Sequence, residues 1–254
     1  MLSKIKKIIY SELKDYEVVL RNVPSIVVTL FVVSVILMNL LGNKELYRSD
    51  YFCISTGVAF SWISFLCMDC ICKRFGGSAA IKINIVAMLI NIFVAVAFYL
   101  LMQFPGKWAA MYATNDVATQ QVINDALNAT FAGTWYVVAG SAIAMFISGV
   151  VNAVINTKVG ILIDDGEYKG FAVRSFISTA IAQWVDNFVF SALVSHIFFH
   201  WNWTQVFICA TTSMILEFCM EAIFSPIGFR IAKRWERDKV GQNYIEFVEG
   251  KHAA

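Results

Sequence analysis

The sequence predicts an all-α membrane protein, a bundle of six transmembrane helices with both termini in the cytoplasm. Of its 254 residues, 59% are hydrophobic and 15% are charged, whereas soluble domains have about 45–50% apolar and about 25% charged residues. The mean hydropathy is +0.66, and the apolar residues lie in long runs. This composition argues against a soluble enzyme, and it excludes a disordered chain because ample apolar surface is available to bury.

Residues 1–23 are predicted to form an amphipathic helix on the cytoplasmic face of the membrane. Apolar residues recur at helical spacing from Ile5 to Tyr16, and lysines occupy most of the remaining surface. That combination is typical of helices that lie in the membrane interface. The segment lacks the short basic tip and the small-residue cleavage site of a signal peptide, so we do not expect it to be cleaved.

Residues 24–232 are predicted to form the transmembrane domain. An apolar segment of about 20 residues is long enough to cross the hydrocarbon core as a helix. Such segments have to be helical, because an unpaired backbone cannot face lipid and none shows the alternating pattern of a barrel strand. The expected spans cover residues 24–41, 52–71, 81–104, 134–156, 171–199 and 203–232. Residues 233–254 follow as a cytoplasmic tail.

The orientation of these spans follows from the distribution of Lys and Arg. Seventeen of the 20 basic residues fall on one side of the predicted membrane, and only Lys44, Arg48 and Lys107 fall on the other. The positive-inside rule places the richer side, which includes both termini, in the cytoplasm. Termini on the same side require an even number of spans.

The longest outside connection covers residues 104–133. Within it, the sequence from Asp116 to Leu127 is typical of a short amphipathic helix. Two roles fit this helix: a lid over an outward-facing mouth, or an interfacial helix with no part in gating. The sequence favours neither.

Four carboxylates lie within the predicted spans, although a charge at the centre of a membrane costs about 2.5–3.5 kcal/mol on insertion scales. They are Asp69, Asp186, Glu217 and Glu221. No Lys or Arg lies as deep, so these groups are expected to face the bundle interior, to be protonated or to meet a polar ligand. Glu217 and Glu221 share a helical face, so we do not expect both to be charged in one pocket.

Amide side chains accompany the carboxylates at spacings that place each pair on one helical face. The pairs are Asn84 with Asn91, Asn152 with Asn156, and Gln183 with Asp186. A single Asn inside a bundle more often joins two helices, at about 0.6 kcal/mol, than it binds a ligand. For Asp186 together with Gln183 we favour a binding role.

The fourth and fifth spans show internal similarity. A shift of 34 positions aligns Ser141–Asn152 with Ser175–Asp186, with four identities in twelve positions. Internal repeats with a binding site near their interface are common in transporters. A true repeat would place Asn152 opposite Asp186 across a pocket.

Metal, catalytic and nucleic-acid roles find little support. Cys67 and Cys70 form a CxxC, but no second CxxC or nearby His completes a four-ligand set. His196 and His200 have metal-ligand spacing, but the chain has no HExxH, Gly-x-Ser-x-Gly or P-loop motif. The net charge of +2 provides no field for nucleic acid. We therefore expect no metal, no cofactor, no catalytic residue and no nucleic-acid partner.

Four segments carry recognisable motifs: Asp69-x3-Lys73-x-Phe75-Gly76, Ser141–Asn152, Arg174–Phe190 and Glu221–Pro226. Together they resemble the queuosine-precursor transporter family, also called the putative vitamin uptake transporter family. The resemblance extends over residues 60–235, and its most specific part is Ser178-Thr179-x3-Gln183-x2-Asp186. It implies uptake of a 7-deazaguanine base, either the cyano or aminomethyl precursor of queuosine or the salvaged base queuine.

The chain departs from the family pattern at two positions. Asn152 stands where the family usually has Asp, and Lys73 stands where many members have Glu and others Arg. A neutral side chain at position 152 would suit a different substituent on the base, because the aminomethyl group is cationic whereas the cyano group is neutral.

Six residues are the expected substrate ligands: Asp186, Gln183, Asn152, Asp69, Asn84 and Glu221. A carboxylate can accept hydrogen bonds from the ring N–H and the exocyclic amine of a guanine-like edge together, and amides can serve donor and acceptor edges. Asp186 is expected to be the principal ligand. Four aromatic residues can sandwich the ring, namely Trp62, Phe65, Trp184 and Phe188. Helix packing or a place in the interfacial aromatic belt is the more common role for each of them.

Some alternatives stay open. The chain has the size of a substrate-binding subunit of an energy-coupling-factor vitamin importer, but its first span offers only Thr29 and Ser34 as small residues for docking a coupling protein. Proton coupling and facilitated diffusion both fit the carboxylates, and the oligomeric state is open, with a homodimer as one option. The expected partners are a nucleobase and the lipid bilayer, in the inner or cytoplasmic membrane of a bacterium.

Overall fold

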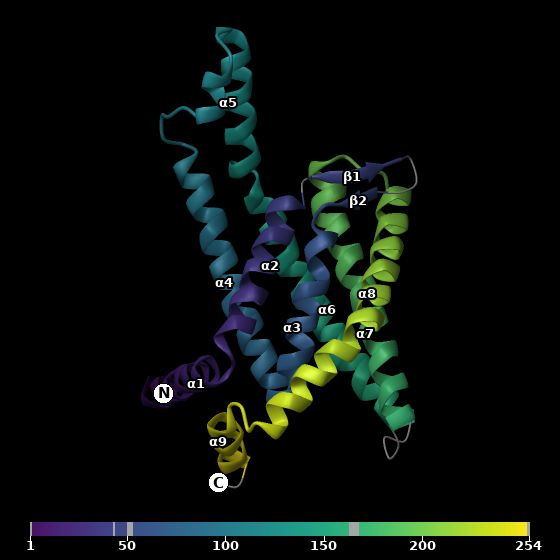
Figure 1. Ribbon diagram of the computed structural model, residues 1–254. Helices are drawn as coiled ribbons and strands as arrows, with labels where there is room; N and C mark the ends of the chain where they lie inside the picture. Colours follow the sequence, from purple (N-terminus) through teal and green to yellow (C-terminus); the bar gives the residue numbers. More distant parts are fainter. Residues whose placement is uncertain (1, 43, 50–52, 163–167, 253–254) are drawn as a thin grey trace. The chain divides into compact units, whose positions relative to one another are not determined.

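The computed structural model describes residues 2–42, 44–49, 53–162 and 168–252, which are helical apart from one short β-hairpin (Figure 1). The helices are α1 Leu2–Asn22, α2 Ser25–Leu41, α3 Val58–Phe75, α4 Gly77–Leu101, α5 Val117–Ala132, α6 Thr134–Leu162, α7 Tyr168–Phe190, α8 Trp203–Arg237 and α9 Gln242–His252. A 3-10 turn, η1, covers Ala109–Ala113, and a π-helical turn, η2, covers Ser191–His196. Strand β1, Glu45–Arg48, pairs antiparallel with β2, Cys53–Ser55.

Each expected span overlaps a helix of the described chain, namely α2, α3, α4, α6, α7 with η2, and α8. The start predicted for the second span is wrong, because Cys53–Ser55 form strand β2 and the helix begins at Val58. By length and composition, three described segments qualify as membrane spans: Gly77–Leu101, Val117–Ser148 and Trp203–Met220. Ile9–Asn22 and Ser25–Leu41 form a pair bent by 106°, which counts as a fourth if the two are one span. The protein is an all-α membrane protein, and the number of six spans stays a prediction.

The chain forms two compact units. Unit 1 consists of Met1–Val35, Phe60–Ile90 and Met220–Ala254. Unit 2 consists of Ile36–Ala59 and Asn91–Cys219. The division cuts through α2, α3, α4 and α8, so each of these helices contributes residues to both units.

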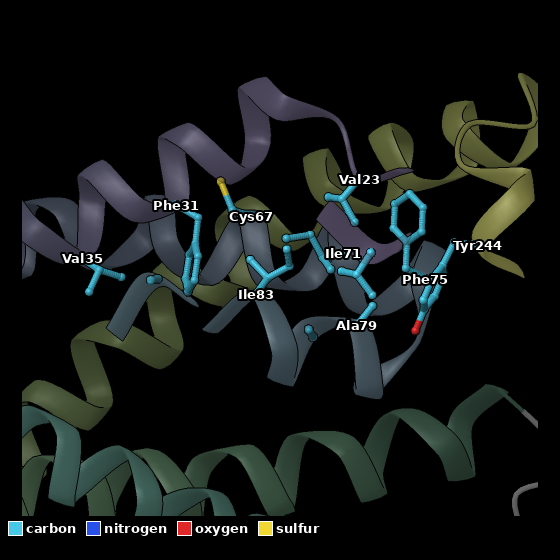
Figure 2. Close-up of a cluster of buried hydrophobic side chains, with 12 residues drawn as sticks. Val23, Phe31, Val35, Cys67, Ile71, Phe75, Ala79, Ile83 and Tyr244 are labelled. Atoms are coloured by element: carbon cyan, nitrogen blue, oxygen red, sulfur yellow. The ribbon is translucent and has the colours of Figure 1, made fainter. Parts of the chain in front are cut away.

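The core of unit 1 is apolar, and its side chains come from α1 to α4, from the α1–α2 connection and from α9 (Figure 2). Its members recur three or four residues apart, as with Cys67 and Ile71 on α3, so each helix buries a single face. The buried side chains are Val19, Val23, Phe31, Val35, Cys67, Ile71, Phe75, Ala79, Ala80, Ile83, Ala87 and Tyr244. Close packing of small and branched residues is the usual source of cohesion between membrane helices.

Helix α1 is attached to α4 by a polar contact. The Nζ atom of Lys82 lies 2.7 Å from Oε2 of Glu12 and 3.9 Å from Oδ2 of Asp15. It also lies 4.7 Å from the centroid of the Tyr16 ring. The side chains of Lys82 and Asp15 are only 13% and 16% exposed, whereas that of Glu12 is 58% exposed. Water therefore screens the short Lys82–Glu12 contact in part.

The turn between α8 and α9 is fastened to the end of α3. The Arg74 Nε–H donates to the carbonyl oxygen of Val240 at 3.0 Å. Gly241 has a φ of +67°, and a Cβ atom there would lie 2.2 Å from the Phe75 ring. Only glycine combines that backbone conformation with so close an approach. Helix α9 follows this turn and lies within residues 233–254, for which the sequence predicted only a cytoplasmic tail.

In unit 2, the helix expected from Asp116 onward is confirmed as α5. The Asp116 carboxylate caps it by accepting the Thr119 N–H at 3.0 Å, the usual role of an N-cap aspartate. The indole Nε1–H of Trp108 donates to Oδ1 of Asn128 at 2.8 Å. The same indole stacks on Phe131, with ring centroids 5.1 Å apart. These contacts fold the connection that follows α4 back onto α5.

Candidate functional site

The polar residues of α7 lie on successive positions of one helix in unit 2. Gln183 is 6% exposed, and Asp186 and Asn187 follow it at spacings of three and four residues. The spacing places all three on neighbouring parts of one helical surface. The site therefore begins as a short polar patch near the C-terminal end of α7.

Asp186 is bound by α6. The Ser148 hydroxyl lies 2.8 Å from Oδ1 of Asp186 and donates to it. Helices α6 and α7 pack against each other, and Ser148 is 8% exposed. Asp186 forms no ion pair with any Lys or Arg side chain that the structure describes. Since a carboxylate offers about four lone-pair positions, the serine leaves it with capacity to accept further hydrogen bonds.

Asn187 joins α7 to α8. Its Nδ2 group donates to Oε2 of Glu217 at 2.8 Å and to the carbonyl oxygen of Gln183 at 3.0 Å. The amide thus provides one hydrogen-bond donor to a half-buried carboxylate on α8. Glu217 is held by a neutral partner, in the same manner as Asp186.

An aromatic group lies beside the polar patch. The rings of Trp184 and Phe188 are stacked with centroids 5.1 Å apart and an interplanar angle of 10°. Phe207 approaches Trp184 edge-on at 5.6 Å. The Trp184 Nε1–H donates to the Thr211 hydroxyl at 3.1 Å. Trp184 and Phe188 therefore pack on each other and leave no gap for a planar ring between them.

The π-helical turn η2 follows this segment. Val194 in η2 is fully buried, and a Cβ atom at Gly140 of α6 would lie 2.3 Å from its Cγ2 atom. Gly140 thus allows α6 and η2 to approach closely. π-Helical turns often occur at functional sites, and this one directly follows α7.

The structure places the expected ligands unequally. It brings Asp186 and Gln183 into one patch of unit 2, whereas Asn84 is half-buried on α4 in unit 1. Three other expected ligands have side chains that lie outside the described residues, namely Asp69, Asn152 and Glu221. The same holds for the side chain of Phe65. Trp62 lies in unit 1 and stacks on Phe224 at 4.3 Å.

The sequence analysis did not single out the partners Ser148, Asn187 and Thr211. Ser148 precedes Asn152 by one helical turn, so it lies on the face that the internal repeat already placed toward Asp186. Asn187 directly follows Asp186. Ser148 could have been found by extending the polar face of Asn152 one turn toward the N-terminus. Asn187 could have been found by extending the face of Gln183 one turn toward the C-terminus. Thr211 offered no such signal, because hydroxyls in apolar helices usually bond to their own backbone.

The described residues contain no group of three His, Cys, Asp or Glu side chains arranged to hold a metal ion. Nδ1 of His196 lies 2.6 Å from the carbonyl oxygen of Trp201, and its ring contacts Trp203. His196 therefore helps to close the connection between η2 and α8.

The sequence of the chain matches a known protein family. The family described as "Putative vitamin uptake transporter" matches residues 55–231. The chain belongs to this family. The match includes α7 with its polar patch, and it ends within α8. No curated protein and no solved structure matches the chain.

Proposed function

We propose that this vitamin uptake transporter imports 7-deazaguanine bases, the precursors of queuosine, across the cytoplasmic membrane of a bacterium. In this proposal the chain carries out secondary or facilitated transport and catalyses no reaction. The observation that supports it best is the Asp186 carboxylate, which is held by the Ser148 hydroxyl at 2.8 Å and is not neutralised by a described cation.

The chemistry of the base explains why such a carboxylate suits it. A guanine-like edge presents a ring N–H and an exocyclic amine side by side, and one carboxylate can accept both. Gln183, one turn earlier, can meet a donor or an acceptor on the same edge. Asn187 is engaged with Glu217, so we assign it a supporting role.

We further propose that the six expected spans are arranged with both termini in the cytoplasm. Within unit 1, α1 near the N-terminus contacts α9 near the C-terminus. This contact supports a common side for the two ends. The charge distribution favours the cytoplasm for that side.

The test is to measure the affinity of wild type and Asp186→Asn for two ligands. One is a 7-deazaguanine, and the other is the matching deazapurine without the exocyclic amine. Asn keeps one acceptor oxygen, so the substitution removes one charge-assisted hydrogen bond, worth about 1.5–3 kcal/mol, and should weaken binding of the guanine-type ligand about ten- to a few hundred-fold. The ligand without the amine should bind poorly to wild type and lose less.

Asp125→Asn provides the matched control, because it makes the same chemical change at an exposed position on α5. It should leave both affinities unchanged. Equal losses for the two ligands in Asp186→Asn would show that Asp186 acts in folding or coupling rather than in reading the base.

A further inference from the structure

Helix α1 carries an apolar stripe that the protein leaves uncovered. Ile9, Leu13 and Leu20 are 53%, 62% and 42% exposed. Their spacing of four and seven residues aligns them along one side of the helix. Glu12, Asp15 and Val19 lie on a different side, where Lys82 and the core of unit 1 hold the helix. The orientation of α1 on unit 1 is therefore fixed, and the exposed stripe does not result from a loosely attached helix.

A second stripe runs beside the first and carries three basic residues together with Tyr10 and Glu17. Lys6, Tyr10, Lys14 and Arg21 follow one another at helical spacing, and all four are exposed. Arg21 is paired with Glu17 at 2.9 Å. Lys6 and Lys14 form no ion pair with any residue of the described chain. Their charges are available to an external anion.

The bend between α1 and α2 determines which surface these stripes meet. The two helices are bent by 106°, so α1 lies close to the membrane plane if α2 crosses the membrane. On α2, Ile26, Leu30 and Val33 are exposed in the same unit, as expected of residues that face lipid. Both helices of the bent pair therefore expose apolar side chains.

We propose that α1 binds the surface of the bilayer, with Ile9, Leu13 and Leu20 inserted among the lipids and Lys6 and Lys14 on the phosphates of acidic phospholipids. The combination matches the physics of interfacial helices, in which an apolar face is buried at the boundary and basic residues flank it. The proposal depends on the membrane location and not on the identity of the substrate. A failure here would leave the proposed transport of bases untouched.

The test is amide hydrogen exchange of α1 in the full-length protein, with one chain per lipid nanodisc. The discs contain phosphatidylcholine alone or phosphatidylcholine with phosphatidylglycerol. A lysine near an anionic surface gains about 1 kcal/mol, so the acidic lipid should slow exchange about fivefold for each lysine. Lys6→Glu/Lys14→Glu should abolish this difference between the two lipids.

Lys44→Glu/Lys107→Glu is the matched control, because it changes the net charge equally at exposed positions outside α1. It should retain the full effect of the acidic lipid. Leu13→Ser should speed exchange in both lipids. Equal exchange of wild-type α1 in the two lipids would overturn the proposal, as would protection of α1 that appears only when two chains share a disc, since the stripe would then bind a second copy.

Discussion

The hydrogen bond between Ser148 and Asp186 is the smallest feature on which the binding proposal depends. The serine hydroxyl holds Oδ1 of Asp186 at 2.8 Å and so restricts the carboxylate to one orientation. A ligand that needs both adjacent acceptors would otherwise have to order that side chain on binding, at a cost in conformational entropy. We therefore regard Ser148 as a positioning residue.

Ser148→Ala should weaken binding of a 7-deazaguanine about tenfold, because a hydrogen bond to a charged group is worth about 1.5 kcal/mol or more. Ser148→Thr keeps the hydroxyl and should bind nearly as well as wild type. Equilibrium binding to the purified protein measures both. Normal affinity in Ser148→Ala would show that Asp186 needs no support from α6.

At this scale, the sequence indicates candidate ligands but not their hydrogen-bond partners. Asp186 and Gln183 could be selected because a carboxylate is costly inside a membrane and is rarely retained there without a use. Their hydrogen-bond partners could not be selected, since Ser148 and Glu217 lie 38 and 30 positions away from the groups they contact. Only the packing of α6 and α8 against α7 establishes those pairs.

Among the elements, the contact of α6 with η2 depends on a residue without a side chain. Gly140→Ala would bring a Cβ atom to 2.3 Å from Cγ2 of Val194, and a valine cannot easily rotate away. We expect a loss of about 1–3 kcal/mol in the free energy of unfolding. Adding Val194→Ala should recover part of the loss that Gly140→Ala causes, because the two side chains occupy the same space.

Gly250→Ala serves as the control, since no atom lies within 4 Å of a Cβ built there. Thermal unfolding of the single and double variants in detergent measures the coupling. Strictly additive effects would contradict the close approach of α6 and η2.

The cap of α5 predicts a dependence of local stability on pH. The hydroxyl and backbone N–H of Thr119 both donate to the Asp116 carboxylate, which lowers the pKa of Asp116 below its ordinary value of 3.8. A group with a lowered folded pKa stabilises the fold above its ordinary pKa, and the stabilisation is lost as pH falls through the folded pKa. Opening of α5 should therefore become easier below about pH 4.

Hydrogen exchange of the α5 amides, corrected for the intrinsic effect of pH, measures this opening. In Asp116→Ala, α5 should open more readily than in wild type near neutral pH. Its opening should not increase further as the pH falls below about 4. Identical pH profiles for the two proteins would show that the cap contributes nothing to the stability of α5.

The helices were predictable because long apolar runs have no other stable form in a bilayer. Helix α9 was missed because Gln242–His252 is polar and short, and its stability comes from the packing of Tyr244 in the core of unit 1 rather than from its own sequence. The π-helical turn η2 was missed for a related reason: nothing in Ser191–His196 distinguishes it from α-helix, and the shift of hydrogen bonds is decided by its surroundings.

For the whole molecule, the division into two units had no counterpart in the sequence. Apolar sequence continues through the boundaries near Val35 and Ile90 without a proline or glycine. The boundary after Ala59 follows Gly57 by two residues, and the one after Cys219 lies between Glu217 and Glu221. Helices that run through both units give each unit a covalent connection to the other at several points. The family match, over residues 55–231, likewise includes parts of both units.

Uptake of a radiolabelled 7-deazaguanine base into bacteria that cannot make their own precursors tests the central claim most directly. Cells that express the wild-type chain should accumulate the label. At label concentrations below the wild-type dissociation constant, cells that express Asp186→Asn at the same level in the membrane should take it up about ten- to a few hundred-fold more slowly, in line with the loss in affinity. Wild-type cells that contain the inserted protein but accumulate no more label than that control would contradict the assignment of these bases as the substrate.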